Sequence, residues 1–174
     1  SFPYLRSHPL SSERMADMQS RQQLQTPRAA NLDSDLIQAM MSSRARVLAQ
    51  PGVDALRAWA NEATDTHIDK QVLTKRMGVL YGAAMSWMQL RDMAQARALI
   101  PRMRQAAGDH ANALRLIRLF EAELGFKEDD MRAAVRALSA TANQAHHQWP
   151  RPELIALAQA SARLHATSAS AETA

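Results

Sequence analysis

The chain of 174 residues contains no cysteine, only five glycines and only 5% aromatic residues. Without cysteine there is no disulfide, no thiolate zinc site and no cysteine nucleophile. The few glycines form no glycine-rich loop of the kind that holds a phosphate. No apolar run approaches the roughly eighteen residues that would cross a bilayer, so we expect no transmembrane segment. The 47% hydrophobic content is nevertheless sufficient for one domain with a core of its own.

The charge is basic, with 21 Lys and Arg against 17 Asp and Glu, and arginine carries the excess. Arginine binds carboxylates and phosphates through two parallel hydrogen bonds. A protein that binds single-stranded nucleic acid also needs aromatic rings beside its bases. The rings of this chain fall in apolar stripes instead, so we expect no nucleic acid among its partners. A basic helical-repeat RNA binder, whose affinity falls steeply with salt, remains a third hypothesis.

Apolar residues recur at helical spacing along most of the chain, and no stretch alternates as a strand does. Breaks are indicated at Pro51-Gly52, Arg91-Asp92, Gly108 and Gly125, and Pro101 predicts a kink. The apolar stripes predict helices near 34–49, 53–63, 73–87, 93–107, 113–124, 131–142 and 154–164.

The predicted helices form pairs at a spacing of roughly 35–37 residues, which resembles a repeat array. The pattern of large and small residues in a tetratricopeptide repeat is met by Leu80, Ala84, Trp87, Ala96 and Ile100. We therefore predict an all-α fold, a tetratricopeptide-like antiparallel helical hairpin array (an α-solenoid). An irregular helical bundle is the alternative, because any amphipathic hairpin shows some of these spacings.

The repeat domain is predicted over 34–165. The remaining residues, 166–174, are small or polar and are predicted to form a frayed or disordered tail.

The six histidines show no pattern of metal ligands or catalytic groups. A zinc peptidase helix carries two histidines four residues apart, with a glutamate after the first, and no histidine pair here has that spacing. His146 and His147 are adjacent and would point in different directions on a helix. His110 beside Asp109 is interpreted as an exposed polar residue. We predict no catalytic residue in this chain.

The first residues look like the end of another domain. In the segment FPYLRSHPLSSERMADM, Ser11 is a good helix N-cap, and Leu10 and Met15 can form a hydrophobic staple across it. The helix that follows, about 12–22, has a thin apolar face. We therefore expect residues 1–25 to be the last part of something larger, followed by a linker over 26–33.

A sequence pattern in this segment resembles a known family. The pattern consists of Tyr4-Leu5, Ser7-His8-Pro9-Leu10, Glu13-Arg14 and Ala16-Asp17. It resembles the closing segment of the catalytic domain of the heat-shock protease X/CAAX prenyl protease family of zinc metallopeptidases. The resemblance is greater to the periplasmic, tetratricopeptide-bearing members, the beta-barrel assembly-enhancing protease group. Weaker similarity continues through 81–103 and 114–125.

The resemblance implies an upstream peptidase domain whose His-Glu-x-x-His helix precedes Ser1. Zinc is then a cofactor of the full-length protein, with none held in this chain, and the chain alone is expected to be inactive. The family's His-Pro loop lies near the catalytic cleft, so His8 is a candidate regulatory zinc contact; the alternative is that it only shapes the loop. The implied location is the periplasm.

The implied function is that of a non-catalytic interaction module of a zinc-dependent metalloendopeptidase. It would present outer-membrane protein substrates, or their assembly machinery, to the protease through a groove lined by first-helix residues. Arg76, Arg115 and Arg118 are candidates for binding peptide carboxylates, or they are solvated surface residues. The alternative function is a stand-alone helical-repeat adaptor that binds a peptide or helix. The coding sequence upstream of Ser1 discriminates between the two.

Overall fold

The structure, a computed structural model, describes residues 15–20, 31–139 and 151–172, with the side chains of the last helix described as far as Ala166. The chain divides into two compact units, residues 1–31 and 32–174. In the first unit, residues 15–20 are helical, inside the predicted helix near 12–22. Met15 and Met18 of this helix are exposed, in agreement with its thin apolar face.

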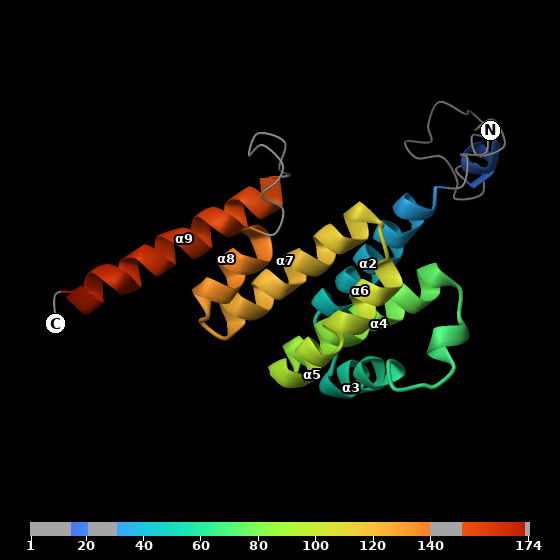
Figure 1. Cartoon of the computed structure of the whole chain (residues 1–174). Helices are drawn as coiled ribbons and strands as arrows, with labels where there is room; N and C mark the ends of the chain where they lie inside the picture. The colour runs from blue at the N-terminus through green and yellow to red at the C-terminus, as the bar shows by residue number, and fades with distance from the viewer. Residues whose placement is uncertain (1–14, 21–30, 140–150, 173–174) are drawn as a thin grey trace, which may run out of the picture. The chain divides into compact units, whose positions relative to one another are not determined.

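The described residues of the second unit form helices, which confirms the all-α prediction for this part of the chain (Figure 1). None of the described helices combines the length and the apolar character needed to cross a bilayer. The helices are α2 (Leu32–Leu48), α3 (Val53–Glu62), the short 3₁₀ helix η2 (Ile68–Lys70), α4 (Leu73–Gln89), α5 (Met93–Ala98), α6 (Ile100–Ala107), α7 (Ala111–Lys127), α8 (Met131–Ser139) and α9 (Arg151–Glu172).

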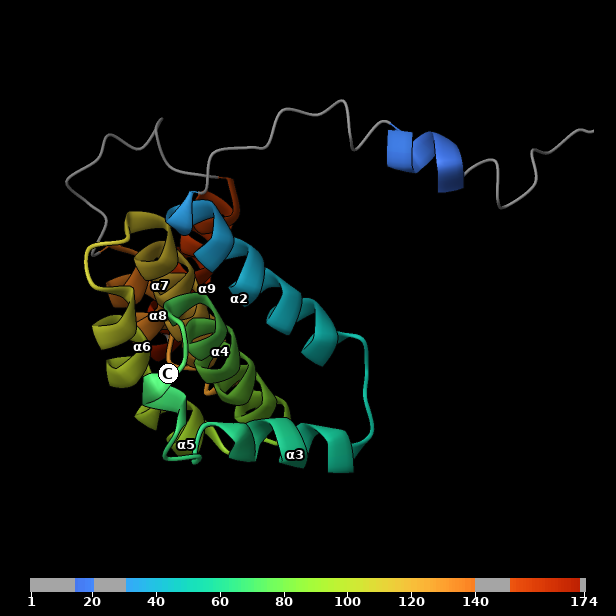
Figure 2. The same cartoon turned by 90° about the vertical axis from the view of Figure 1, so that its right-hand side faces the viewer.

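Helix α4 is the central element of this unit. It packs against α2, α3, α5 and α6, and α2 also contacts α7 (Figure 2). Its predicted stripe is confirmed at Met77, Leu80 and Ala84, which are fully or almost fully buried. The rings of Tyr81 and Phe120 connect α4 to α7, with centroids 5.8 Å apart. Helix α7 packs on α8, and α8 packs on α9.

Small residues let α2 and α4 approach each other closely. Gly78 and Gly82 lie one turn apart on α4, opposite Ala39 and Ser43 on α2. A Cβ atom at Gly82 would lie 3.2 Å from the Cβ of Ser43, and one at Gly78 would lie 3.4 Å from the carbonyl oxygen of Ala39. This contact places α2 across α4, where it also reaches α7.

The predicted kink at Pro101 is confirmed, and it divides the helix in two. Helix α5 ends at Ala98 and α6 begins at Ile100, with Pro101 in the first turn of α6. Proline is tolerated there because the amide it lacks would have no helical partner in a first turn. Gly108 ends α6 with φ 52°, as predicted for a left-handed terminal residue.

The prediction that Gly125 ends a helix is wrong. Helix α7 continues to Lys127, and the positive φ that turns the chain belongs to Asp129 (φ 59°). Gly125 is buried, and a Cβ there would lie 2.9 Å from both the Asp130 carbonyl oxygen and the Ala134 amide nitrogen. The absence of a side chain therefore permits close packing of α8 on α7.

The start of α2, the exposure of Val53 and the end of α9 differ from the predictions. Helix α2 begins at Leu32, inside the predicted linker 26–33, because Asp33 and Asp35 suit a first helical turn. Val53, predicted on the inner face of its helix, is exposed because it is the first residue of α3. Helix α9 continues to Glu172, through most of the predicted tail 166–174, and the alanines of that segment favour a helix.

Candidate peptide-binding groove

Four helices of the second unit line an open groove of about 580 Å³. Helix α7 lies between α2 and α9 and contacts both (Figure 1). Helix α4 contributes the side chain of Tyr81. The lining residues from α2 are Ile37, Met41 and Arg44; those from α7 are Arg115, Leu116, Leu119, Glu123 and Phe126; those from α9 are Pro152, Glu153, Ile155, Ala156 and Gln159.

Apolar side chains that are partly open to solvent dominate the groove lining. Met41 of α2 is 44% exposed and Ile155 of α9 is 57% exposed. Ile37, Leu119 and Phe126 are half-buried around them. If an apolar surface of another molecule covers these side chains, their apolar area is removed from water, and this burial favours binding.

An ion pair joins α2 to α7 inside the groove. Arg44 donates two hydrogen bonds to Glu123, 2.9 Å from Nη1 to Oε2 and 2.7 Å from Nη2 to Oε1. Arg44 Nη1 also lies 3.4 Å from the Tyr81 hydroxyl oxygen. Burial disfavours the charged guanidinium, but the hydrogen bonds and the charge of Glu123 outweigh it and raise the pKa of Arg44. The pair is therefore a fixed charged part of the groove.

A second ion pair, between Arg115 of α7 and Glu153 of α9, lacks part of its hydrogen bonding. Glu153 is only 5% exposed. Its Oε1 lies 3.3 Å from Arg115 Nε. The geometry of this contact does not make a hydrogen bond, so Arg115 Nε is buried without a hydrogen-bond partner. The second carboxylate oxygen, Glu153 Oε2, is also buried without one. Since a buried carboxylate oxygen without a donor is costly, Glu153 is an incompletely satisfied acceptor in the wall of the groove.

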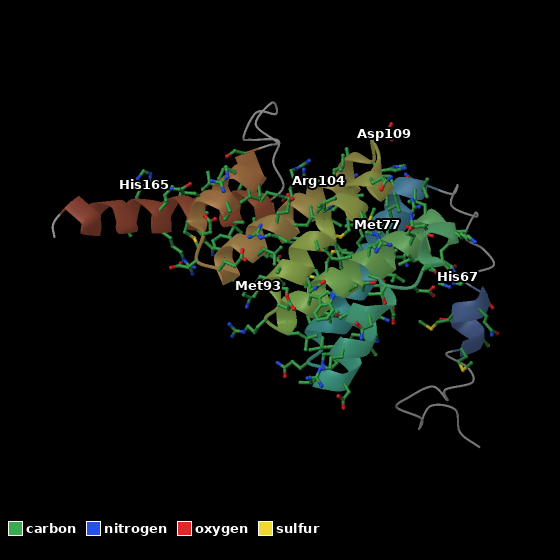
Figure 3. The ribbon with its side chains drawn as sticks, turned by 60° about the horizontal axis from the view of Figure 1, so that its bottom comes forward. His67, Met77, Met93, Arg104, Asp109 and His165 are labelled. Atoms are coloured by element: carbon green, nitrogen blue, oxygen red, sulfur yellow. The ribbon has the colours of Figure 1, made fainter. Side chains whose placement is uncertain are left out.

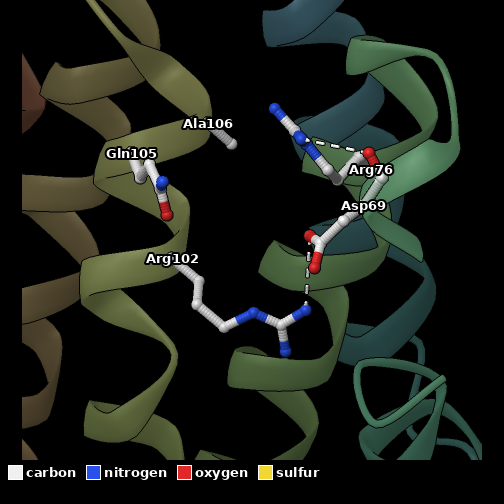
Figure 4. Close-up of a pocket in the computed structure, with 5 residues that line it drawn as sticks. All are labelled: Asp69, Arg76, Arg102, Gln105 and Ala106. Carbon is white, nitrogen blue, oxygen red and sulfur yellow. Dashed lines mark hydrogen bonds and ion pairs between the residues drawn. The ribbon is translucent and has the colours of Figure 1, made fainter. Parts of the chain in front are cut away.

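The structure places two of the three predicted arginines close to this groove. Arg115 lines it. Arg118, one turn further along α7, is half-buried, and burial together with the nearby charge of Arg104 lowers its pKa. Arg76 lines a separate cleft (Figure 4). The three side chains therefore do not form one site, and their role in binding peptides stays a prediction.

Sequence reasoning missed the residues that give the groove its polar character. Arg44 and Glu123 are 79 positions apart, and Glu153 occupies an ordinary first helical turn. Apolar spacing identifies the face that each helix buries, but it does not show which polar residues at the borders of two faces will meet. A coupled substitution pattern among relatives is the signal that would have found the Arg44 and Glu123 pair.

The described residues contain no cluster of three or more His, Cys, Asp or Glu side chains that could hold a metal ion. His8, His146 and His147 lie outside the described residues. His67 and His165 are well separated (Figure 3). His110 is half-buried rather than exposed, because its Nδ1 lies 4.0 Å from Asp33 Oδ1 at the start of α2.

Comparison of the chain with models of protein families, with curated proteins and with solved structures gave no match.

Proposed function

We propose that residues 32–174 are a non-catalytic protein-interaction module and that the groove between α2, α7 and α9 binds an apolar segment of a partner protein. The observation that carries this proposal is the coincidence of two features in one groove. Exposed apolar side chains, Met41 and Ile155, line the same space as the buried Glu153 carboxylate with its unpaired oxygen. Grooves between helices commonly receive an amphipathic helix in this way.

We further propose that the helices from α4 to α8 are two tetratricopeptide-like hairpins. Support comes from small residues where paired helices pack together. Ala84 of α4 and Ala96 of α5 are fully buried. Gly125 of α7 lies against Ala134 of α8. The division of the first hairpin's second helix at Pro101 departs from a regular repeat.

We propose that the module belongs to a zinc metalloendopeptidase of the periplasm and presents outer-membrane protein substrates, or their assembly machinery, to it. The support is the residue pattern between Tyr4 and Asp17, which resembles the end of that family's catalytic domain. The proposal assigns no step of the hydrolysis to this chain. We accordingly expect the purified chain to leave casein intact, and hydrolysis by the chain alone would contradict the non-catalytic role.

The groove favours one kind of occupant, an amphipathic helix with a cationic side chain at the border of its apolar face. The apolar face would cover Met41, Leu119 and Ile155. The cation would pair with the Glu153 carboxylate in the groove wall. A hydrogen bond to a charged group contributes about 1.5–3 kcal/mol, so this contact would select among partners of equal hydrophobicity.

The test is the binding of a fluorescently labelled, leucine-rich amphipathic peptide with one lysine, measured by anisotropy. The double variant Met41→Gln/Ile155→Gln should weaken binding about tenfold or more, because both side chains lose apolar contact with the peptide. The matched control is Leu48→Gln/Val72→Gln, which changes apolar residues of comparable or greater exposure (47% and 70%) outside the groove. Equal weakening by both double variants would contradict binding in the groove.

A second peptide, in which methionine replaces the lysine, tests the occupant's charge. Wild-type protein should bind it about tenfold more weakly than the lysine peptide. In Glu153→Gln this preference should disappear, whereas a general loss of folding would weaken both peptides alike. A preference unchanged in Glu153→Gln would contradict the assigned role of Glu153.

A further inference from the structure

A second, polar cleft lies between the start of α4 and helix α6, apart from the groove described above (Figure 4). Its volume is about 470 Å³. Arg102, Gln105 and Ala106 contribute from α6, where they lie on one face at a spacing of three and four residues. Asp69 of η2 and Arg76 of α4 contribute from the opposite side.

The two guanidinium groups of this cleft are only partly occupied by the protein itself. Arg102 donates a 2.7 Å hydrogen bond to the carbonyl oxygen of Ala63, and its other terminal nitrogen lies 3.6 Å from Asp69 Oδ1. Arg76 donates one long hydrogen bond, 3.4 Å, to the backbone oxygen of Asp69. Arg76 Nε is buried and has no hydrogen-bond partner. A buried charged donor without an acceptor is costly, and each guanidinium otherwise makes only one hydrogen bond to the described residues, so N–H donors remain for a ligand in the cleft.

The charge of the lining residues sets the charge of a suitable ligand. Two arginines and one aspartate leave a formal charge of +1 in the cleft. A monoanion neutralises this charge, whereas a dianionic phosphate would bring more negative charge beside the Asp69 carboxylate. Guanidinium groups bind the planar carboxylate through parallel hydrogen bonds. The side-chain amide of Gln105 adds a neutral donor at the same wall.

We propose that this cleft binds a peptide carboxylate between Arg76 and Arg102. The ligand is either the free C-terminus of a peptide or an acidic side chain, since both offer the same monoanionic group. The cleft is a site distinct from the apolar groove and shares no lining residue with it. Its test therefore does not depend on the proposed function.

The test follows the Nε–H resonance of Arg76 by nuclear magnetic resonance while short peptides are added to the folded chain. Acetyl-trialanine with a free C-terminus, the same peptide as an amide, and an amidated peptide with one glutamate are the three probes. A shift of the Arg76 resonance with a carboxylate-bearing probe, and none with the neutral amide, is expected. Comparison of the two acidic probes identifies the preferred source of the carboxylate. Equal shifts with all three peptides would overturn the proposal.

Three variants separate binding from structural damage. Arg76→Gln should weaken carboxylate binding at least fivefold, measured through the backbone resonances of α6. Arg57→Gln is the matched control, because Arg57 is exposed and lies outside the cleft. Asp69→Asn should tighten binding about fivefold, since it removes a like charge beside the ligand. A gain in affinity does not result from unfolding, so unchanged or weaker binding in Asp69→Asn would also overturn the proposal.

Discussion

Arg44 of α2 and Glu123 of α7 are joined by two hydrogen bonds of 2.9 and 2.7 Å. Most of each side chain is removed from solvent, with 22% of Arg44 and 25% of Glu123 still exposed. Helix α2 otherwise packs mainly on α4. The pair therefore ties α2 to α7 and fixes one wall of the groove.

Breaking this pair should destabilise the fold in a coupled manner. We expect Arg44→Met and Glu123→Gln each to lower the free energy of unfolding by about 1.5–3 kcal/mol, because each leaves a partly buried partner unsatisfied. The free energy of unfolding of the double variant should fall by at least about 1 kcal/mol less than the sum of the losses in the two single variants. Urea unfolding of the four proteins measures this coupling. The control is the same set of substitutions at the exposed pair Arg57 and Asp54, which lie 3.9 Å apart and should show a coupling energy near zero. Strictly additive losses at Arg44 and Glu123 would contradict the prediction.

Tyr81 should make the fold sensitive to alkaline pH. Burial raises the pKa of Tyr81, while the charge of Arg44 opposes the shift only in part. A phenol whose pKa is higher in the folded state contributes stability that is fully present below its unfolded pKa of about 10. That contribution falls as the pH rises above this value and is lost as the pH passes through the higher folded pKa. Tyr81→Phe keeps the ring beside Phe120 and removes the titration.

The measurement is the free energy of unfolding between about pH 8 and pH 11. Wild-type protein should lose stability more steeply than Tyr81→Phe above about pH 10, and the difference between the two curves removes the contributions of lysine and arginine. Parallel curves over the whole range would show that Tyr81 does not titrate differently in the folded and unfolded states.

The sequence was sufficient to predict what depends on local spacing. The stripe of Met77, Leu80 and Ala84 and the break at Pro101 are both found in the structure. Each follows from one helix alone, because an apolar face has to be buried and a proline lacks an amide.

The groove could not be predicted in the same way because it depends on how separate helices meet. Gly78 and Gly82 suggest a close approach in hindsight, but their spacing does not identify Ala39 and Ser43 as the opposing surface. Gly125 was misinterpreted for a related reason: a glycine that ends a helix and a glycine that admits a neighbour look alike in one dimension. Only the tertiary contact distinguishes the two roles.

Gly125→Ala should destabilise the packing of α8 on α7. The added Cβ would lie 2.9 Å from two backbone atoms, which can move away only if α8 shifts. We expect a loss of about 1–3 kcal/mol, as for other overpacked positions, measured by urea unfolding. The control is Gly52→Ala, because nothing lies within 4 Å of a Cβ at Gly52 and its φ of −61° suits alanine. Equal stability of the two variants would contradict the close-packing role.

The chain should not bind single-stranded RNA appreciably at about 150 mM salt. Several of the described arginines already bind carboxylates, since Arg97 pairs with Glu128 and Arg104 donates to both carboxylate oxygens of Glu121. Three of the rings in the described part of the chain are also buried or covered. Tyr81 and Phe120 are fully buried, and the guanidinium of Arg46 lies 4.3 Å from the centroid of the Trp59 ring.

Anisotropy of a labelled oligouridine measures this prediction. At about 50 mM salt we expect only weak binding that declines as salt is added, because released counterions then supply nearly all of the affinity. The apolar groove and the polar cleft at Arg76 and Arg102 should be unaffected, so the oligouridine should not displace the amphipathic peptide. Submicromolar binding at about 150 mM salt with a steep salt dependence would instead favour the helical-repeat RNA binder.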